Sequence, residues 1–557
     1  MSAKSFFLMS CLMIASQVHS ITAKESAADL ILTNARVYTL SLEPQRVEAV
    51  VIRGGRIVFA GSAESAERQR GDRTRVLDLG GATVIPGLVD AHAHLLSLGR
   101  SLSEVNLVGT KTKEEIRRII LEKQMSARPG EWISGRGWDQ NDWRERDFPT
   151  AEDLAGTDDN PVYLRRVDGH AVWVNRRALQ QCGITKATPD PMGGRILRDA
   201  EGNPSGVFVD NAIDLVRRQM PAPTLEMQVN WAKAALRECN RMGLTGVHDA
   251  GVDSMALEVY RALRRRGELT LRIYAMLDDA DRDWLERRWA AGPEIGDDLL
   301  TVRAVKIYAD GALGSRGAAL LEPYSDDPGN CGIMVNPPEY LERMTRRAVE
   351  RGFQVCTHAI GDAANRSVLD VYERILQQLP RGDYRLRVEH AQVLAPEDVP
   401  RFGESGIIAS MQPTHATSDM DWAEERLGAK RIRYAYAWRK LLNAGARLAF
   451  GSDFPVESPD PLAGIYAAVT RRDRGGNPVG GWYPEERLSV QEAVESFTLQ
   501  AAYAGFAEEE RGTIEPGKQA DLVVLDRDLF EIPAEGILQA KVLYTIVGGQ
   551  IVYAADE

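Results

Sequence analysis

The stretch LVDAHAH, residues 88–94, decides the fold of this chain, because apolar and polar side chains alternate along it. In a β-strand, residues i and i+2 lie on the same side, so Asp90, His92 and His94 share one face. A barrel strand has this pattern when its inner face carries chemistry and its outer face packs against helices. Two neutral imidazoles this close form half of a site for zinc or a similar divalent ion. A polar strand end at the surface has the same pattern, so residues at the ends of other strands are needed to distinguish a metal site from this alternative.

The chain is long and acidic. It has 557 residues, of which 44% are hydrophobic, and a formal net charge of −12. This length predicts about two to four domains, although barrels longer than about 250 residues fold as one unit. The negative charge and the lack of Lys/Arg-rich blocks argue against a nucleic-acid partner. Assembly into a homo-oligomer stays open.

The N-terminus has the pattern of a secretory signal peptide, predicted over residues 1–23. Lys4 precedes an apolar run over residues 6–15, and small-residue cleavage sites follow, ending at Ser20 or Ala23. The run is short for a membrane span, although an uncleaved anchor remains the alternative. We therefore expect a periplasmic or secreted protein without stable membrane insertion after cleavage. The cysteines left after cleavage are Cys182, Cys239, Cys331 and Cys356, and they form no C-x-x-C pair. The sequence leaves open whether two of them form a disulfide.

The two ends of the chain resemble each other. Residues 24–83 contain short apolar, β-prone runs separated by turns such as Gly54-Gly55, and residues 506–557 repeat the pattern. ADLVVL (520–525) echoes ADLIL (28–32), and GGQIVY (548–553) echoes GGRIVF (54–59). We expect both ends to form one β-sandwich beside the central domain. Two independent β modules are the alternative.

Residues 84–505 alternate strand-like and helical segments, which is typical of a parallel α/β fold. Eight such units predict a (β/α)8 TIM-like barrel, with an insertion at about residues 100–160 that contains Trp132, Trp138 and Trp143 and is a candidate cover for the site. The predicted strands are residues 88–94, 162–164, 246–248, 301–308, 353–358, 386–390, 407–411 and 448–453. The predicted helices include residues 112–124, 225–241, 339–351 and 366–378.

Ligand-capable side chains gather at the ends of these strands. Barrel enzymes place their chemistry at the C-terminal ends of the strands, so residues from five strands should meet on one rim. They are His92, His94, Lys306, His358, His390 and Asp453.

One motif resembles the first-strand signature of the amidohydrolase superfamily, and four more resemble its YtcJ-like branch, which includes N-substituted formamide deformylases. The resemblance runs from about residue 28 to the C-terminus, with the motifs in family order. They are VIPGLVDAHAH (84–94), VKIYADGALGSR (305–316), THAIGD (357–362), RVEH (387–390) and GSDFPV (451–456).

The resemblance implies a metal centre. His92, His94 and Asp453 would hold one divalent ion, and His358 and His390 a second. Zinc fits these ligands, with manganese, cobalt or iron as alternatives. Lys306 would be carboxylated, because a carbamate can bridge two cations and an ammonium cannot; an unmodified lysine would leave a one-metal site. Asp453 would also act as the catalytic base.

Five further residues are substrate-side candidates, none of them expected to be a metal ligand, and three of them, His248, Asp310 and Arg316, have a structural alternative. His248 could polarise a carbonyl or only satisfy the rim, and Arg316 could bind a carboxylate or stabilise its loop. The others are His170, Asp310 and His415.

Together with the predicted signal peptide, the resemblance implies an exported hydrolase that cleaves an amide, N-acyl or N-formyl C–N bond of a small molecule by metal-activated hydroxide. The same site could hydrolyse an ester, lactone or phosphoester. A non-catalytic exported metal-binding or regulatory protein on the same barrel is the third hypothesis.

Overall fold

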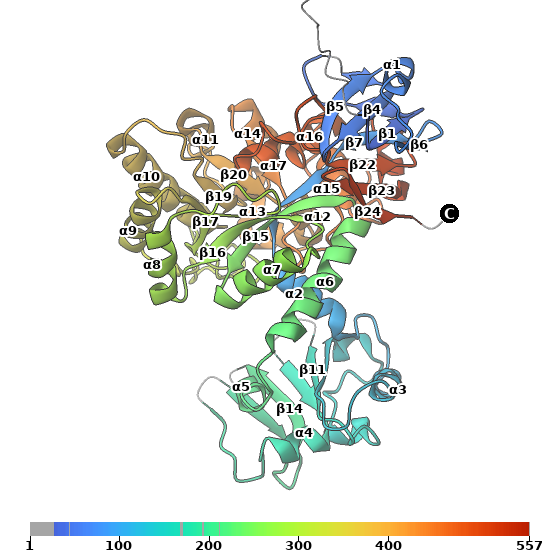
Figure 1. Cartoon of the computed structure of the whole chain (residues 1–557). Coiled ribbons are helices and arrows are strands. Elements are labelled where there is room, and N and C mark those ends of the chain that lie inside the picture. Colours follow the sequence, from blue (N-terminus) through green and yellow to red (C-terminus); the bar gives the residue numbers. More distant parts are fainter. Residues whose placement is uncertain (1–26, 44, 167–170, 192–193, 211, 556–557) are drawn as a thin grey trace, which may run out of the picture.

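The computed structural model describes residues 27–555 except 44, 167–170, 192–193 and 211 (Figure 1). The predicted signal peptide, residues 1–23, lies outside the described residues. Of the helices in the described ranges, none is both long and apolar enough to cross a membrane.

An eight-stranded parallel sheet forms the centre of the molecule, and it confirms the predicted TIM-like barrel. The sheet closes because Asp453 N donates to His92 O over 2.8 Å and His94 N donates to Phe454 O over 2.9 Å. In chain order the strands are β8 (Leu88–Ala93), β15 (Leu244–Val252), β16 (Arg272–Asp278), β17 (Leu300–Tyr308), β18 (Gln354–Ala359), β19 (Arg387–His390), β20 (Ile408–Met411) and β21 (Leu448–Phe450).

One predicted barrel strand is wrong. Residues 162–164 lie in β11 (Val162–Arg166), which belongs to a different sheet, and β16 takes its place between β15 and β17. Alternation of side chains shows that a run is extended but carries no information about which sheet it joins. The prediction reached eight strands by counting β11 in and leaving β16 out.

The helices that cover the barrel follow the predicted 3.6-residue periodicity closely. Residues 225–241 form α6, whose first turn is capped by Thr224, and residues 339–351 and 366–378 fall within or beside α9 and α10. The helices on the barrel are α2 (Leu95–Ser103), α6 (Leu225–Arg241), α7 (Ser254–Arg266), α8 (Arg282–Ala291), α9 (Pro338–Val349), α10 (Asp362–Gln378), α11 (Val399–Ser405), α12 (Pro413–Asp419), α13 (Ala423–Arg431), α14 (Trp438–Asn443), α15 (Pro461–Thr470), α16 (Val490–Ser496) and α17 (Leu499–Ala504).

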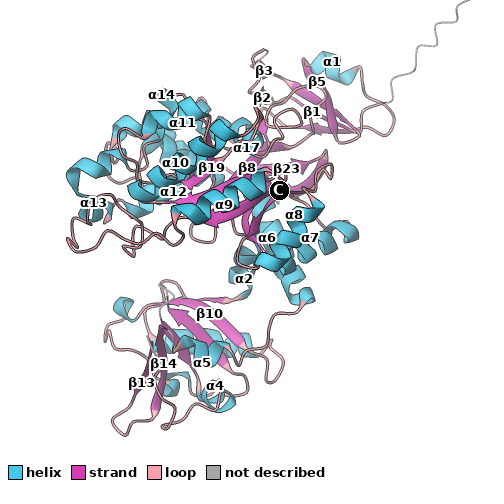
Figure 2. Cartoon of the chain, turned by 90° about the vertical axis from the view of Figure 1, so that its left-hand side faces the viewer, coloured by secondary structure: helices cyan, strands magenta, loops and turns pink. Residues whose placement is uncertain are grey.

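The insertion is a separate lobe and is larger than the predicted 100–160. It leaves the barrel after α2, returns through α6, and lies below the barrel in Figures 1 and 2. Trp138 and Trp143 are buried in its own hydrophobic core, so they are structural side chains and not a cover over the site. Its elements are β9 (Val105–Asn106), α3 (Lys113–Gln124), β10 (Ile133–Trp138), β11, β12 (Ala171–Val174), α4 (Arg176–Gln181), β13 (Gly194–Arg198), β14 (Pro204–Asp210) and α5 (Ile213–Arg217).

The chain ends pair with each other beside the barrel, as expected. β22 runs antiparallel to β7, with Val523 opposite Ile85, and β7 continues through Gly87 into the histidine-bearing strand β8. One sheet has the order β5-β4-β1-β6 and the other β24-β23-β22-β7-β2-β3. Their elements are β1 (Leu30–Thr33), β2 (Arg36–Tyr38), β3 (Arg46–Val47), β4 (Ala49–Arg53), β5 (Arg56–Gly61), α1 (Ala63–Glu67), β6 (Arg75–Asp78), β7 (Thr83–Pro86), β22 (Leu522–Leu525), β23 (Val542–Val547) and β24 (Gln550–Ala554).

Candidate metal centre

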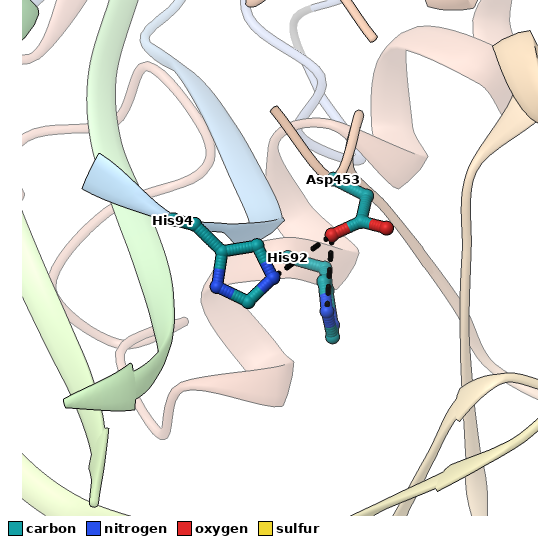
Figure 3. A group of neighbouring side chains, drawn as sticks. All are labelled: His92, His94 and Asp453. Atoms are coloured by element: carbon teal, nitrogen blue, oxygen red, sulfur yellow. Dashed lines mark ion pairs between the residues drawn. The ribbon is translucent and has the colours of Figure 1, made fainter. Parts of the chain in front are cut away.

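A cluster of imidazoles and one carboxylate lies at the C-terminal ends of the barrel strands. His92 is on β8, His94 follows it, His390 ends β19, and Asp453 lies three residues after β21. The side chains of His92, His94 and Asp453 point toward one another (Figure 3). Both His390 and Asp453 have positive φ, at 75° and 60°, a conformation rare outside glycine that tends to occur at functional sites.

The Asp453 carboxylate is the hub of this cluster. Its Oδ1 lies 3.0 Å from His94 Nε2 and 3.6 Å from His92 Nε2. Burial alone would raise the pKa of Asp453, but contact with His94 and the proximity of the other histidines hold it well below its usual value. The carboxyl group is therefore ionised at neutral pH.

Hydrogen bonds on the far side of each ring fix which nitrogen faces the centre. His94 Nδ1 donates to the carbonyl oxygen of Ala250 over 2.8 Å, because a carbonyl can only accept. His92 Nδ1 donates to Glu389 Oε2 over 2.5 Å, and His390 Nδ1 donates to Gln412 Oε1 over 2.8 Å. In the neutral rings, each Nε2 then carries a lone pair.

The positions of these lone pairs indicate whether the cluster could bind a cation. In the neutral form of His94, its Nε2 and Asp453 Oδ1 are both acceptors, 3.0 Å apart, and no other hydrogen-bond donor in the described part of the chain reaches the buried Oδ1. Two acceptors this close repel unless a cation lies between them. Imidazole nitrogens oriented by second-shell carbonyl or carboxylate groups are the usual ligands of zinc. The residues present therefore fit a divalent metal ion.

A second group shares Asp453 with the first. Ligand atoms of His390, His415 and Asp453 all lie within 4.8 Å of one another. The predicted second-metal residue His358 is close to His390, with ring centroids 4.5 Å apart, but its Nε2 faces the carbonyl oxygen of Gly311 at 3.4 Å. Burial and the charge of Lys306 lower the pKa of His358 to about 3, so this imidazole is neutral.

Lys306 lies where the prediction placed it, on β17 facing the histidines. Its Nζ is 3.4 Å from His92 Nε2 and 4.6 Å from the ring centre of Tyr308. The side chain is buried, and no carboxylate among the described residues lies within 4.0 Å of Nζ. An unpaired ammonium is costly in such surroundings.

Sequence reasoning missed the buried ion pair that supports His92. Arg387 Nε lies 2.8 Å from Glu389 Oε1, and both side chains are fully buried. Burial would raise the pKa of Glu389, but Arg387 and His92 lower it strongly. Burial and the charge of Lys306 lower the pKa of His92 to about 4, although Glu389 opposes this shift. The signal was present in RVEH (387–390), because Arg387 and Glu389 share one face of a strand and that face points into the barrel.

Three of the five substrate-side candidates differ in whether and where the structure places them. His170 lies outside the described residues. His415 reaches the metal cluster itself, with Nε2 3.8 Å from Asp453 Oδ2. The exposed Arg316 pairs with Asp326 at 2.8 Å, which favours the loop-stabilising alternative.

Asp310 and His248 also hold structural positions. Asp310 accepts three backbone N–H groups, from Ala319, Ile360 and Gly361, so its carboxylate clasps two loops and is not free for substrate. β15 continues to Val252, so His248 lies in the barrel interior below the rim. Its Nδ1 is 2.8 Å from Arg387 Nη1. Both placements favour the structural alternative that the sequence left open for each residue.

The four cysteines of the described chain, Cys182, Cys239, Cys331 and Cys356, are all free thiols. The disulfide that the sequence left open is therefore absent among the described residues.

A TIM-like barrel with clustered histidines and an aspartate at its strand ends defines the class of metal-dependent barrel hydrolases. Comparison with known proteins supports this class. Two solved structures titled as uncharacterized metal-dependent hydrolases, from Pyrococcus horikoshii OT3 and Pyrococcus furiosus, align with TM-scores of 0.77 and 0.76. The sequence identities are 30% and 29%, and the alignments cover 91% and 90% of this chain and 99% and 100% of the solved ones.

The particular family follows from the sequence match. The profile of the amidohydrolase family matches residues 75–553, and the chain belongs to this family. It is 36% identical to YtcJ of Bacillus subtilis (strain 168), whose name assigns it to the amidohydrolases, over 93% of this chain and 98% of that protein. It is 29% identical to an N-substituted formamide deformylase of Arthrobacter pascens, over 94% and 98%.

These findings confirm the predicted YtcJ-like branch of the family. The chain is therefore a metal-dependent hydrolase that acts on carbon–nitrogen bonds other than peptide bonds.

Proposed function

We propose that this protein is an exported hydrolase that cleaves the C–N bond of an amide, N-acyl or N-formyl group in a small molecule, with divalent metal ions bound at the barrel rim. The observation that carries the proposal is the pair of facing acceptors, His94 Nε2 and Asp453 Oδ1, at 3.0 Å. The similarity to an N-substituted formamide deformylase supports a formyl or acyl group as the part of the substrate that is hydrolysed.

The donor atoms of the clustered side chains indicate which residues would bind each metal ion. His92, His94 and Asp453 would hold one zinc ion, and His358 and His390 would contribute to a second. Bound divalent ions supply Lewis acidity, which polarises a carbonyl and acidifies water.

Lys306 would complete the centre as a carbamate. The neutral amine takes up CO₂, an N–C bond forms and one proton is released, and the resulting carbamate shares a single negative charge between its two oxygens. This modification replaces the unpaired buried ammonium with a group that the neighbouring cations stabilise.

Asp453 performs the proton transfers in this proposal. Its carboxylate takes a proton from the attacking water and delivers it to the leaving nitrogen, so that the amine departs neutral. Glu389 and the carbonyl of Ala250 hold His92 and His94 in the tautomers that keep their Nε2 lone pairs on the centre.

The test removes the base and keeps the fold. We expect Asp453→Asn to lower kcat by at least about 100-fold, as for other general bases, while part of the bound metal stays. The assay uses the zinc-loaded protein with N-substituted formamides, N-acyl amino acids and lactones. Turnover of lactones alone would contradict a C–N hydrolase, and full activity of Asp453→Asn would contradict the role of this residue.

Export is the remaining part of the proposal, and it rests on the sequence of residues 1–23. We expect the protein expressed in a bacterium to appear in the periplasm or medium with its N-terminus at Ile21 or Lys24. Mass spectrometry of the recovered protein measures this. An intact chain retained in the cytoplasm would contradict it.

A further inference from the structure

The imidazole of His415 reaches the centre of the cluster although it belongs to none of the strand-end motifs. We propose that His415 is a ligand of the second metal ion, together with His390 Nε2 and Asp453 Oδ2. This inference rests on the metal dependence proposed above and assigns one more residue to it.

The position of His415 follows from the turn after β20. Gln412 follows this strand as the N-cap of α12, which begins at Pro413, so His415 lies in the first turn of the helix. Its ring is nearly parallel to that of His390, with an interplanar angle of 14° and centroids 6.0 Å apart. Gln412 accepts the Nδ1–H of His390 from the same turn. One short segment therefore orients His390 and also presents a second imidazole beside it.

The ring nitrogen Nε2 of His415 lies near Asp453 but has no hydrogen-bond partner among the described residues. This atom is buried, and it lies 3.8 Å from Asp453 Oδ2. That distance is too long for a hydrogen bond. Zinc bonds of about 2.0–2.1 Å place two ligand atoms of a tetrahedral site about 3.4 Å apart. The spacing is thus close to that of two ligands on one ion.

Asp453 would serve both metal positions. Its Oδ1 is the oxygen nearest His92 and His94, and its Oδ2 is the oxygen nearest His415, so each oxygen lies beside a different group of imidazoles. Each carboxylate oxygen has two lone pairs, so ligation leaves capacity for the proton that Asp453 transfers. The second position then contains the imidazoles of His358, His390 and His415 and one carboxylate oxygen, a donor set that suits zinc.

The experiment counts ions and measures their affinities in the full chain. Metal-stripped wild type, His415→Ala and a control on the same helix, Thr417→Ala, are titrated with Zn²⁺ against a chromophoric chelator. Bound zinc is then measured by elemental analysis. We expect two ions in wild type and in Thr417→Ala. In His415→Ala the second ion should bind at least about 100-fold more weakly, because loss of a ligand exceeds the 10–100-fold cost of losing an outer-shell partner.

A spectroscopic readout keeps the test independent of activity. In the Co²⁺-loaded protein, the visible absorption of the second ion should change in His415→Ala, and His94→Ala should change the first. Circular dichroism checks the fold, and His415→Asn replaces His415→Ala if the alanine variant is unfolded.

The outcomes separate this inference from the proposed function. Wild-type protein that binds no divalent ion contradicts both. Wild-type protein that binds ions, with a folded His415→Ala that binds them equally well, contradicts only the role of His415. A loss of turnover in His415→Ala with both ions at wild-type affinity would place His415 on the substrate and overturn its assignment as a ligand.

Discussion

At the scale of single residues, the chemistry depends on which nitrogen of each imidazole faces the centre. The sequence predicted the positions of His92, His94 and His390 because strand alternation is a local property. The tautomers depend on Glu389, Gln412 and the carbonyl of Ala250, which come from three other strands or their ends. No local pattern contains that information, so only the assembled barrel shows it.

The support of His92 by Glu389 leads to a prediction. We expect Glu389→Gln to weaken zinc binding by about 10–100-fold, because Gln keeps an oxygen acceptor but lacks the charge that holds His92 and neutralises Arg387. A chelator competition titration measures the affinity. Glu397→Gln, which changes an exposed carboxylate paired with Arg366, is the control. Unchanged zinc affinity in Glu389→Gln would show that His92 needs no anionic partner.

At the scale of elements, the prediction was correct where the local sequence pattern defines a helix. It was wrong where the pairing of distant strands defines the sheet to which a strand belongs. The helix over residues 225–241 was predicted from its apolar periodicity, and α6 has these bounds. The assignment of residues 162–164 to the barrel was wrong, because β11 pairs with β10 and β12 in the insertion. The choice between two sheets is made by long-range contacts and not by propensity.

The start of α16 gives a prediction on pH. Ser489 and Glu492 form a capping box, and Glu492 also binds Arg439 of α14. This arginine, opposed by some desolvation, lowers the pKa of Glu492 from 4.5 to about 2. A carboxyl group with a lower pKa in the folded state stabilises the fold fully above the unfolded pKa, and this contribution is lost as pH falls from about 4.5 toward 2.

We therefore expect Glu492→Gln to lower the Tm at pH 7 and to have a smaller effect at pH 3.5. Gln retains the capping geometry, so the difference isolates the charge. Because the side chain is about one-third exposed, the effect at pH 7 should be at most about 1 kcal/mol. Thermal unfolding at both pH values measures it, with Glu495→Gln on the same helix as control. A Tm difference that is equal at both pH values would contradict the assignment.

At the scale of the whole molecule, the two chain ends and the barrel are one structural unit. β7 leads directly into β8, so the sandwich holds the strand that carries His92 and His94. A buried ion pair between Arg272 of β16 and Asp521 just before β22 joins the two parts at 2.5 Å. The insertion lobe has its own core and contacts this unit through α2 and α6.

Loss of that ion pair should destabilise the whole chain. We expect Asp521→Ala to lower the free energy of unfolding by about 3–5 kcal/mol, because Arg272 would keep a buried, uncompensated charge. Glu226→Ala, which removes an exposed partner of Arg266, should cost less than about 1 kcal/mol. Urea unfolding followed by circular dichroism compares the two. Equal effects would mean that the barrel and the sandwich do not depend on this contact.

The sequence by itself determined the barrel class, the pairing of the two ends and the strand-end residues of the metal centre. These properties follow from strand alternation, helical periodicity and motif order, which are written along the chain. Only the tertiary structure decided that β16 is a barrel strand, that Asp310 and His248 are structural, that Glu389 and Arg387 support His92, and that His415 joins the cluster. Each of these depends on atoms far apart in sequence, whose distances are set when the barrel closes.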